Sequence, residues 1–247
     1  MLVTKHRANI AALMKLQPST LEAISHCGFF KELQPDEFQA VVQEGRPYHI
    51  KQGQYFFHQG EPATHFYVIG EGEVKLSQIN ADGQQTIVAY LGSSHGLGII
   101  VVLSQTNYPV AAEAVTDCVA LQFDHEITRL LMLKYPQLAI NGMELVVEQF
   151  TALQNRLEQM ATQRVEQRVA RSILQLVRQF GTKSDEGVLI DMPLSRQDLA
   201  EMTGTNLYNV SRIMSKWEQD GIIKTGRKRV VLCQPHELVV IAEDLPK

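Results

Sequence analysis

Cysteines are scarce in this sequence, and it has no long apolar run. The three cysteines, Cys27, Cys118 and Cys233, are scattered along the chain without CxxC spacing. An odd, scattered set indicates a reducing cytoplasm rather than a disulfide framework or a structural zinc site. No apolar stretch approaches the roughly 20 residues that a membrane-spanning helix requires. We therefore expect a cytoplasmic protein without a membrane partner.

The first residues resemble a signal peptide only superficially. Lys5, His6 and Arg7 precede a short apolar run, but Lys15 interrupts that run early and no small-residue cleavage site follows. We expect residues 1–16 to form a short helix that leads into the first domain.

Acidic residues outnumber basic ones over the whole chain, but the balance differs between its parts. Residues 1–163 contain 10 Lys and Arg against 16 Asp and Glu, whereas residues 164–230 contain 12 against 8. A local basic excess is typical of a chain in which one module meets phosphate.

Short β-type runs punctuated by glycine extend from about Phe29 to Phe123. Strands this short, joined at such regular turns, predict an antiparallel roll or barrel. The segment 80–83, Asn-Ala-Asp-Gly, predicts a hairpin tip, because the Asp-Gly pair supplies the positive φ that such turns need. The fold class that we predict is α+β, with a sensing domain over residues 1–135.

A helical pattern follows Pro136 and continues to Arg164. Its apolar side chains advance by threes and fours, which is the spacing of a coiled-coil seam. One helix cannot bury such a stripe alone, so we predict a dimerisation helix over 136–164 and a parallel homodimer. The alternative is a helix that packs only on its own β-roll. The predicted seam consists of Met143, Val147, Phe150, Leu153, Leu157 and Met160.

The remaining residues, 165–247, predict a winged helix-turn-helix. A helix from Val165 to Phe180 stops at Gly181, and a polar loop over 182–187 and a strand over 188–190 follow. Ser195 caps the next helix, Gly204 forms a tight turn, and Asn206 caps a second helix. A basic hairpin completes the motif, which favours DNA binding over a small helical domain for protein contact. The predicted DNA-binding residues are Ser195, Arg196, Thr205, Asn206, Leu207, Tyr208, Asn209, Ser211, Arg212, Lys216, Arg227, Lys228 and Arg229.

These motifs resemble the cyclic-AMP receptor protein and fumarate-nitrate-reduction regulator family over nearly the whole chain. The most specific stretches are residues 195–204, Val210-Ser211-Arg212 and residues 217–223. The resemblance implies a homodimer on a two-fold related DNA site, a cyclic-nucleotide-binding-like β-roll and contact with RNA polymerase. It also assigns the base-reading arginine to Arg212. The DNA-binding segment is most similar to the branch that answers nitric oxide in nitrate-respiring bacteria.

The sequence departs from the family pattern in the recognition helix and in the sensing pocket. Many members have glutamate four residues before the base-reading arginine, where this chain has Tyr208. Cyclic-AMP-binding members carry Gly-Glu and Arg-Ser or Arg-Thr pairs, where this chain has Gly96-Leu97 and Tyr108-Pro109. Burying a phosphate there without an arginine would be costly. We therefore expect that cyclic AMP is not the effector, and that the usual half-site cannot be assumed.

The effector stays open at this point. An iron-sulfur cluster needs four cysteine ligands, and this chain has three, of which only Cys27 lies near the N-terminus. The alternatives are haem with a diatomic gas such as nitric oxide, an organic ligand, or no effector at all. His95 is a weak candidate for a haem ligand, and the metal site is otherwise unknown. The candidate pocket residues are His95, Gly96, Leu97, Tyr108 and Gln154.

The alternative to a DNA-binding regulator is a protein of a different class. It would be an enzyme or a cyclic-nucleotide-binding regulatory subunit built on the same roll. The sequence has neither a His-Glu-x-x-His motif nor a phosphate-binding loop. We therefore expect a DNA-binding regulator without enzymatic activity. Binding of a palindrome without turnover would separate the two classes.

Overall fold

The computed structural model describes residue 13, residues 16–99 and residues 106–245. The chain forms two compact units, one of residues 1–78 and 91–152, the other of residues 79–90 and 153–247. The helix expected over residues 1–16 lies almost entirely outside the described residues. Within the described part of the chain, no helix is long and apolar enough to span a bilayer.

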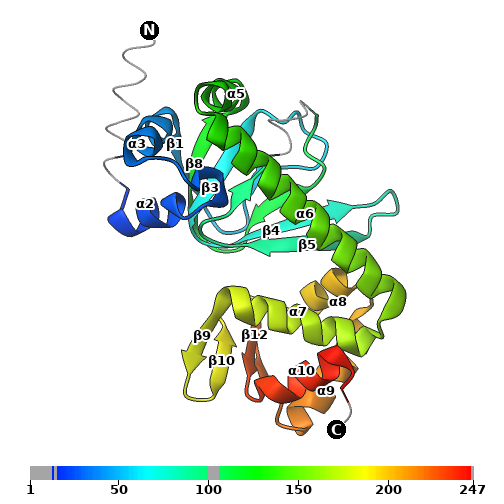
Figure 1. The fold of residues 1–247 in the computed structure, drawn as a ribbon. Coiled ribbons are helices and arrows are strands. Elements are labelled where there is room, and N and C mark those ends of the chain that lie inside the picture. Colours follow the sequence, from blue (N-terminus) through cyan, green and yellow to red (C-terminus); the bar gives the residue numbers. More distant parts are fainter. Residues whose placement is uncertain (1–12, 14–15, 100–105, 246–247) are drawn as a thin grey trace. The chain divides into compact units, whose positions relative to one another are not determined.

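The N-terminal part of the chain folds into a β-roll of two four-stranded sheets (Figure 1), which confirms the predicted roll. One sheet has the order β1-β8-β3-β6, and the other has the order β2-β7-β4-β5. The strands are β1 (Arg46–Ile50), β2 (Tyr55–Phe57), β3 (His65–Glu71), β4 (Val74–Ile79), β5 (Gln85–Leu91), β6 (Gly96–Leu97), β7 (Ala111–Ala114) and β8 (Cys118–Asp124). The predicted tip at 80–83 is confirmed, because Gly83 has φ of 79° and the Asn80 amide bonds the Gln84 carbonyl.

Strand β3 is buried on both faces because its side chains alternate between two cores. Phe66 and Val68 belong to a core shared with the helices of this unit, whereas Tyr67 and Ile69 point into the interior of the roll. The helices and the 3-10 turn are α2 (Pro18–Ser25), η1 (Gly28–Phe30), α3 (Pro35–Glu44), α5 (His125–Lys134) and the first turns of α6 (Pro136–Thr162). The roll is therefore a packed scaffold with apolar side chains on its inside.

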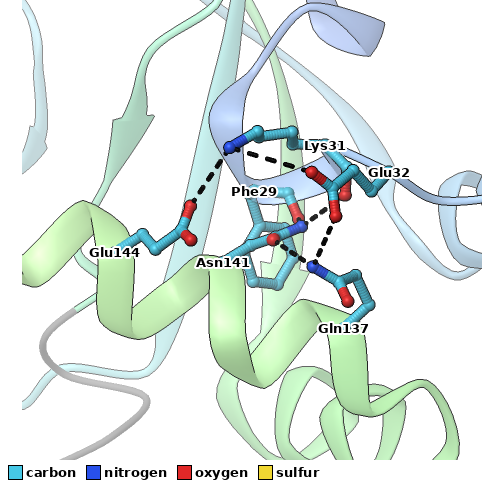
Figure 2. A network of polar contacts seen from close by, with 6 residues as sticks. All are labelled: Phe29, Lys31, Glu32, Gln137, Asn141 and Glu144. Carbon is cyan, nitrogen blue, oxygen red and sulfur yellow. Dashed lines mark hydrogen bonds and ion pairs between the residues drawn. The ribbon is translucent and has the colours of Figure 1, made fainter.

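A polar network ties the turn after η1 to the start of α6 (Figure 2). Asn141, which is 1% exposed, donates to the carbonyls of Phe29 and Lys31 and accepts from Gln137. Lys31 pairs with Glu144 at 3.6 Å. Buried polar groups require such partners, so this network fixes where α6 begins on the first unit.

We expect Asn141→Leu to destabilise the protein by about 2 to 3 kcal/mol, because the buried Phe29 carbonyl and the part-buried Lys31 carbonyl would lose their donor. Thermal unfolding followed by circular dichroism measures the loss. Gln137→Ala is the control, since its partners Glu32 and Asn141 would keep other contacts, and we expect an effect below about 1 kcal/mol. An unchanged midpoint for Asn141→Leu would show that the network carries no stability.

The second unit contains helices packed on a small sheet (Figure 1). Its sheet has the order β11-β12-β10-β9. The elements after α6 are α7 (Val165–Phe180), β9 (Gly181–Ser184), β10 (Gly187–Ile190), α8 (Arg196–Thr203), α9 (Leu207–Gln219), β11 (Ile223–Gly226), β12 (Arg229–Leu232) and α10 (Pro235–Glu243). Together with the roll, this arrangement confirms the predicted α+β class with a C-terminal winged helix-turn-helix.

The polar loop predicted over 182–187 is wrong. Residues 181–184 form strand β9, which pairs with β10 in antiparallel register. The side chains are polar because the strand lies at the edge of the sheet and is exposed to water. The stop at Gly181 is confirmed, but its φ of −77° is not left-handed. Glycine is needed there because a Cβ would lie 2.1 Å from the Val177 carbonyl.

Candidate nucleic-acid interface and sensing pocket

Helix α8 begins at the predicted cap. The Ser195 hydroxyl accepts from the Asp198 amide, and the Asp198 carboxylate accepts in return from the Ser195 amide. The helix ends at Gly204, which has φ of 61° and allows the chain to turn at once into α9. Ser195 and Arg196, both predicted DNA contacts, are half-buried at the start of α8.

Helix α9 separates a buried face from an exposed polar face. Val210, Ile213, Met214 and Trp217 are buried, as the apolar spacing predicted. The Asn206 side chain caps the helix by accepting from the Asn209 amide, and Asn209 donates to the Thr205 hydroxyl. Of the predicted DNA contacts on this helix, Leu207, Tyr208, Arg212 and Lys216 are exposed, and Asn209 and Ser211 are half-buried.

The wing is a tight hairpin whose tip is hydrogen-bonded to the segment just before α8. Gly226 pairs with Arg229, so the connection consists of Arg227 and Lys228. The Leu194 amide donates to the Lys228 carbonyl at 3.1 Å. All three wing cations are exposed, which leaves them free to meet a polyanion.

The end of α9 is bound to the wing through Glu218. Its carboxylate accepts from both the amide and the hydroxyl of Thr225, each at 2.9 Å. These two hydrogen bonds, the backbone bond first, hold the pKa of Glu218 below its usual range. The carboxylate therefore stays ionised at neutral pH and keeps wing and helix together.

Helix α7 supports both helices of the motif with two polar side chains. Arg168 donates to the carbonyls of Thr203, at the end of α8, and Gln163. Glu166 accepts from the indole N–H of Trp217 at 3.2 Å. Sequence reasoning missed the Arg168–Thr203 and Glu166–Trp217 contacts, since no spacing rule pairs residues 35 or 51 positions apart.

A depression of about 490 Å³ lies between the start of α7 and the outer face of α9. Its lining consists of Arg164, Val165, Glu166, Asn209, Arg212, Ile213 and Lys216. Three of these side chains are cations and one is an acid. The surface next to the recognition helix is thus mainly positive and suited to a phosphate backbone.

The predicted effector pocket is filled by the side chains that were expected to line it. Tyr108 is buried and stacks on Phe57 with ring centroids 3.7 Å apart. Its hydroxyl donates to the His65 carbonyl at 2.8 Å. Burial raises the pKa of Tyr108, so the phenol stays protonated and remains a donor. Leu97 is buried in the same core.

Within the first unit, His95 and Gly96 do not join Tyr108 and Leu97 in a polar site. His95 is exposed, and its Nδ1 lies 3.1 Å from the carbonyls of Gly92 and Ser93 in its own turn. Gly96 lies on β6, where a Cβ would meet the Phe66 ring at 2.9 Å. Gln154 is exposed on α6, in the second unit. Among the described residues, no cluster of three metal-ligating side chains is found.

Residues 92–96, Gly-Ser-Ser-His-Gly, match the spelling of the Gly-x-Ser-x-Gly motif of serine hydrolases. In that motif the serine sits on a turn from a strand to a helix. Here Ser94 lies between strands β5 and β6, and its hydroxyl donates to the Ala23 carbonyl at 2.7 Å. The match is therefore one of sequence only.

Two family models match the chain. Residues 47–135 match the cyclic nucleotide-binding domain, and residues 167–241 match the Crp-like helix-turn-helix domain. Together they cover about two thirds of the chain.

Similar proteins include regulators from several bacteria. The chain is 22% identical over 217 residues to the CRP-like cAMP-activated global transcriptional regulator of Mycobacterium tuberculosis, covering 88% of this chain and 97% of the relative. It is 24% identical over 207 residues to the transcriptional activator protein anr of Pseudomonas aeruginosa, covering 84% of each. The solved structure of the c-di-GMP responsive global regulator CLP from Xanthomonas campestris has a TM-score of 0.71 at 18% identity, covering 81% of this chain and 99% of that chain.

The β-roll, the long helix and the winged helix-turn-helix define a DNA-binding transcription regulator with an effector-binding-type domain. The chain belongs to the cyclic-AMP receptor protein and fumarate-nitrate-reduction regulator family, as the sequence motifs predicted.

Proposed function

We propose that this regulator is a homodimer that reads an inverted repeat with α9 and clamps the DNA backbone with its wing. The observation that carries the proposal is the exposed polar face of α9, which ends in Arg212 and Lys216 and is flanked by exposed cations at the wing. Arg212 would read a base, and Arg227, Lys228 and Arg229 would hold phosphates. The other predicted DNA-binding residues would position the helix on its site.

The proposed dimer rests on the apolar stripe of α6. Within one chain this stripe is exposed: Phe150 is 58% and Leu157 is 69% accessible to water. Large apolar side chains repeated along one helix face indicate an interaction surface. A parallel copy of α6 would cover them with the same residues and supply the two-fold axis that an inverted repeat requires. We assign residues 136–164 to dimerisation, 1–135 to sensing and 165–247 to DNA binding.

We further propose that the roll does not take cyclic AMP. The relatives differ in the effectors that their names give, cyclic AMP in one and c-di-GMP in another, so the fold does not determine the ligand. In this chain Tyr108 and Leu97 belong to the apolar core of the roll. An anion placed against them would lack a cationic partner. Haem with a gas, an organic effector and no effector are the remaining proposals.

The remaining partners follow from the function of the family. RNA polymerase is a proposed partner, because a transcription regulator acts by changing how this enzyme initiates transcription at a promoter. Since genomic DNA is the other partner, we place the protein in the cytoplasm. An absorption spectrum of protein from haem-supplied cells, before and after nitric oxide, tests the haem proposal.

Selection of bound sequences from random DNA tests the DNA-binding proposal. We expect the wild-type protein to enrich a palindromic site with two half-sites about 34 Å apart, one helical turn. Enrichment of no common sequence would contradict it.

We expect millimolar cyclic AMP to leave the DNA affinity unchanged, because Tyr108, stacked on Phe57, stands where cyclic-AMP-binding members of the family have the arginine that pairs with the phosphate. Calorimetry measures binding to the protein, and a shift assay measures the effect on DNA. A cyclic-AMP-dependent family member, treated in parallel, shows that the assay responds. Saturable heat of binding to this chain would show that the Phe57–Tyr108 stack opens for a ligand.

A further inference from the structure

We propose that Glu166 is a positioning residue for DNA binding, which fixes Trp217 in the core and holds Lys216 against the protein until DNA competes for it. This inference rests on the proposed DNA contacts of α9. It concerns a residue that lies on α7, outside the helix-turn-helix itself.

The first observation is the contact with Trp217. The indole nitrogen of Trp217 lies 3.2 Å from Oε1 of Glu166, and the ring is fully buried. An indole N–H is a donor only, so a buried indole without an acceptor would be penalised. The carboxylate supplies that acceptor from the first turn of α7, where a negative charge is also favoured by the helix dipole. Glu166 therefore couples the start of α7 to the C-terminal end of the recognition helix.

The second observation is the contact with Lys216. Its ammonium lies 3.6 Å from the same oxygen of Glu166. The side chain of Lys216 is 66% exposed and that of Glu166 is 38% exposed. An ion pair so open to water is weak. A DNA phosphate can therefore replace the carboxylate as the partner of this lysine.

The third observation is the distribution of charge around the depression. Glu166 is the one acid among its lining residues, beside the cations Arg164, Arg212 and Lys216. Arg164 pairs with Asp244. Among the described residues, Arg212 forms no ion pair. Two of these cations thus have an acidic partner within the protein, whereas Arg212, the proposed base reader, has none among the described residues.

A thermodynamic consequence follows for the salt dependence. A lysine that neutralises a phosphate releases a cation condensed on the DNA, and each such contact adds about 0.9 to the magnitude of the slope of log affinity against log salt. When Lys216 leaves Glu166 for a phosphate, the uncovered carboxylate next to the DNA retains a cation in exchange for the one displaced, so the wild-type contact adds little to the slope. Removing the carboxylate charge should therefore increase by about one the number of cations released when the protein binds DNA. It should also strengthen binding to all sequences alike.

The experiment compares Glu166→Gln and Glu166→Ala with the wild type in salt titrations on specific and unrelated DNA. Both variants should increase the magnitude of the slope by about 0.9. Affinity for unrelated DNA should rise about as much as affinity for the site, so specificity does not improve. Adding Lys216→Gln to Glu166→Gln should cancel the increase. Glu237→Gln, which removes a charge on α10 outside the depression, is the matched control and should leave the slope unchanged.

Fluorescence separates the positioning role from the charge effect, because Trp217 is the only tryptophan in the sequence. Glutamine keeps a carbonyl acceptor for the indole, so Glu166→Gln should retain the wild-type emission. Glu166→Ala should shift the emission and increase quenching by added acrylamide, without DNA present. An unchanged salt slope in Glu166→Gln would contradict the proposed effect of Glu166 on Lys216. A wild-type emission spectrum in Glu166→Ala would contradict its proposed role in positioning Trp217. If the wild type bound no DNA, the proposed function would fail, while the fluorescence result would still stand.

Discussion

Replacing both Phe150 and Leu157 with glutamate is expected to give a monomer that no longer binds its DNA site specifically. The two side chains lie on the exposed apolar stripe of α6. In a parallel pair of helices, each glutamate would face its own copy across an apolar seam, where charges are poorly solvated and repel. Sedimentation measures the oligomeric state, and a shift assay measures DNA binding.

The expected loss of affinity is large because a dimer binds its second half-site as an intramolecular step. Losing that step lowers the affinity by about 10²-fold or more. Thr151→Glu and Asn155→Glu together are the control, since both residues are exposed on α6 away from the stripe. This pair adds the same charge and should remain dimeric. A stable dimer of the Phe150 and Leu157 double variant would remove the basis for the seam.

Replacing Arg212 with alanine is expected to relax the sequence preference at one position of each half-site. An arginine on the exposed face of α9 can donate to guanine O6 and N7 together, and loss of such a pair costs about 1–3 kcal/mol of discrimination. Selection from random DNA, repeated with the variant, measures the preference at every position.

The wing variants provide the contrast. Removing Arg227, Lys228 or Arg229 one at a time should weaken binding to all sequences, with a fall of about 0.9 in the salt slope for each cation that meets a phosphate. The preferred sequence should stay the same. If Arg212→Ala kept the preference and a wing variant changed it, the roles of reader and clamp would be reversed.

The parts predicted best from the sequence are those specified by local patterns. Ser195, Gly204 and Asn206 act within three or four residues of their own helices, and the structure has them as two caps and a left-handed turn. The apolar spacing of α9 predicted which of its side chains are buried. Such features depend on helix geometry and little else.

The parts that could not be predicted depend on contacts between distant residues. Strand β9 looks polar in sequence because it lies at a sheet edge, and only its pairing with β10 makes it a strand. The resemblance identified Tyr108 and Leu97 as departures, but not the stack of Tyr108 on Phe57. Glu166 lies 51 positions from Trp217, so no local signal connects them.

The attachment of the wing has a consequence for kinetics. Strand β12 lies between β11 and β10, and the Lys228 carbonyl at the tip is bonded to the Leu194 amide. The hairpin is therefore ordered before DNA arrives, and no loop has to fold during the encounter. Association should then be limited by diffusion and charge, and slow as salt is added. The residence time on a non-cognate DNA site is set by how fast the preformed contacts dissociate. The protein can therefore leave such a site without unfolding any part of the wing.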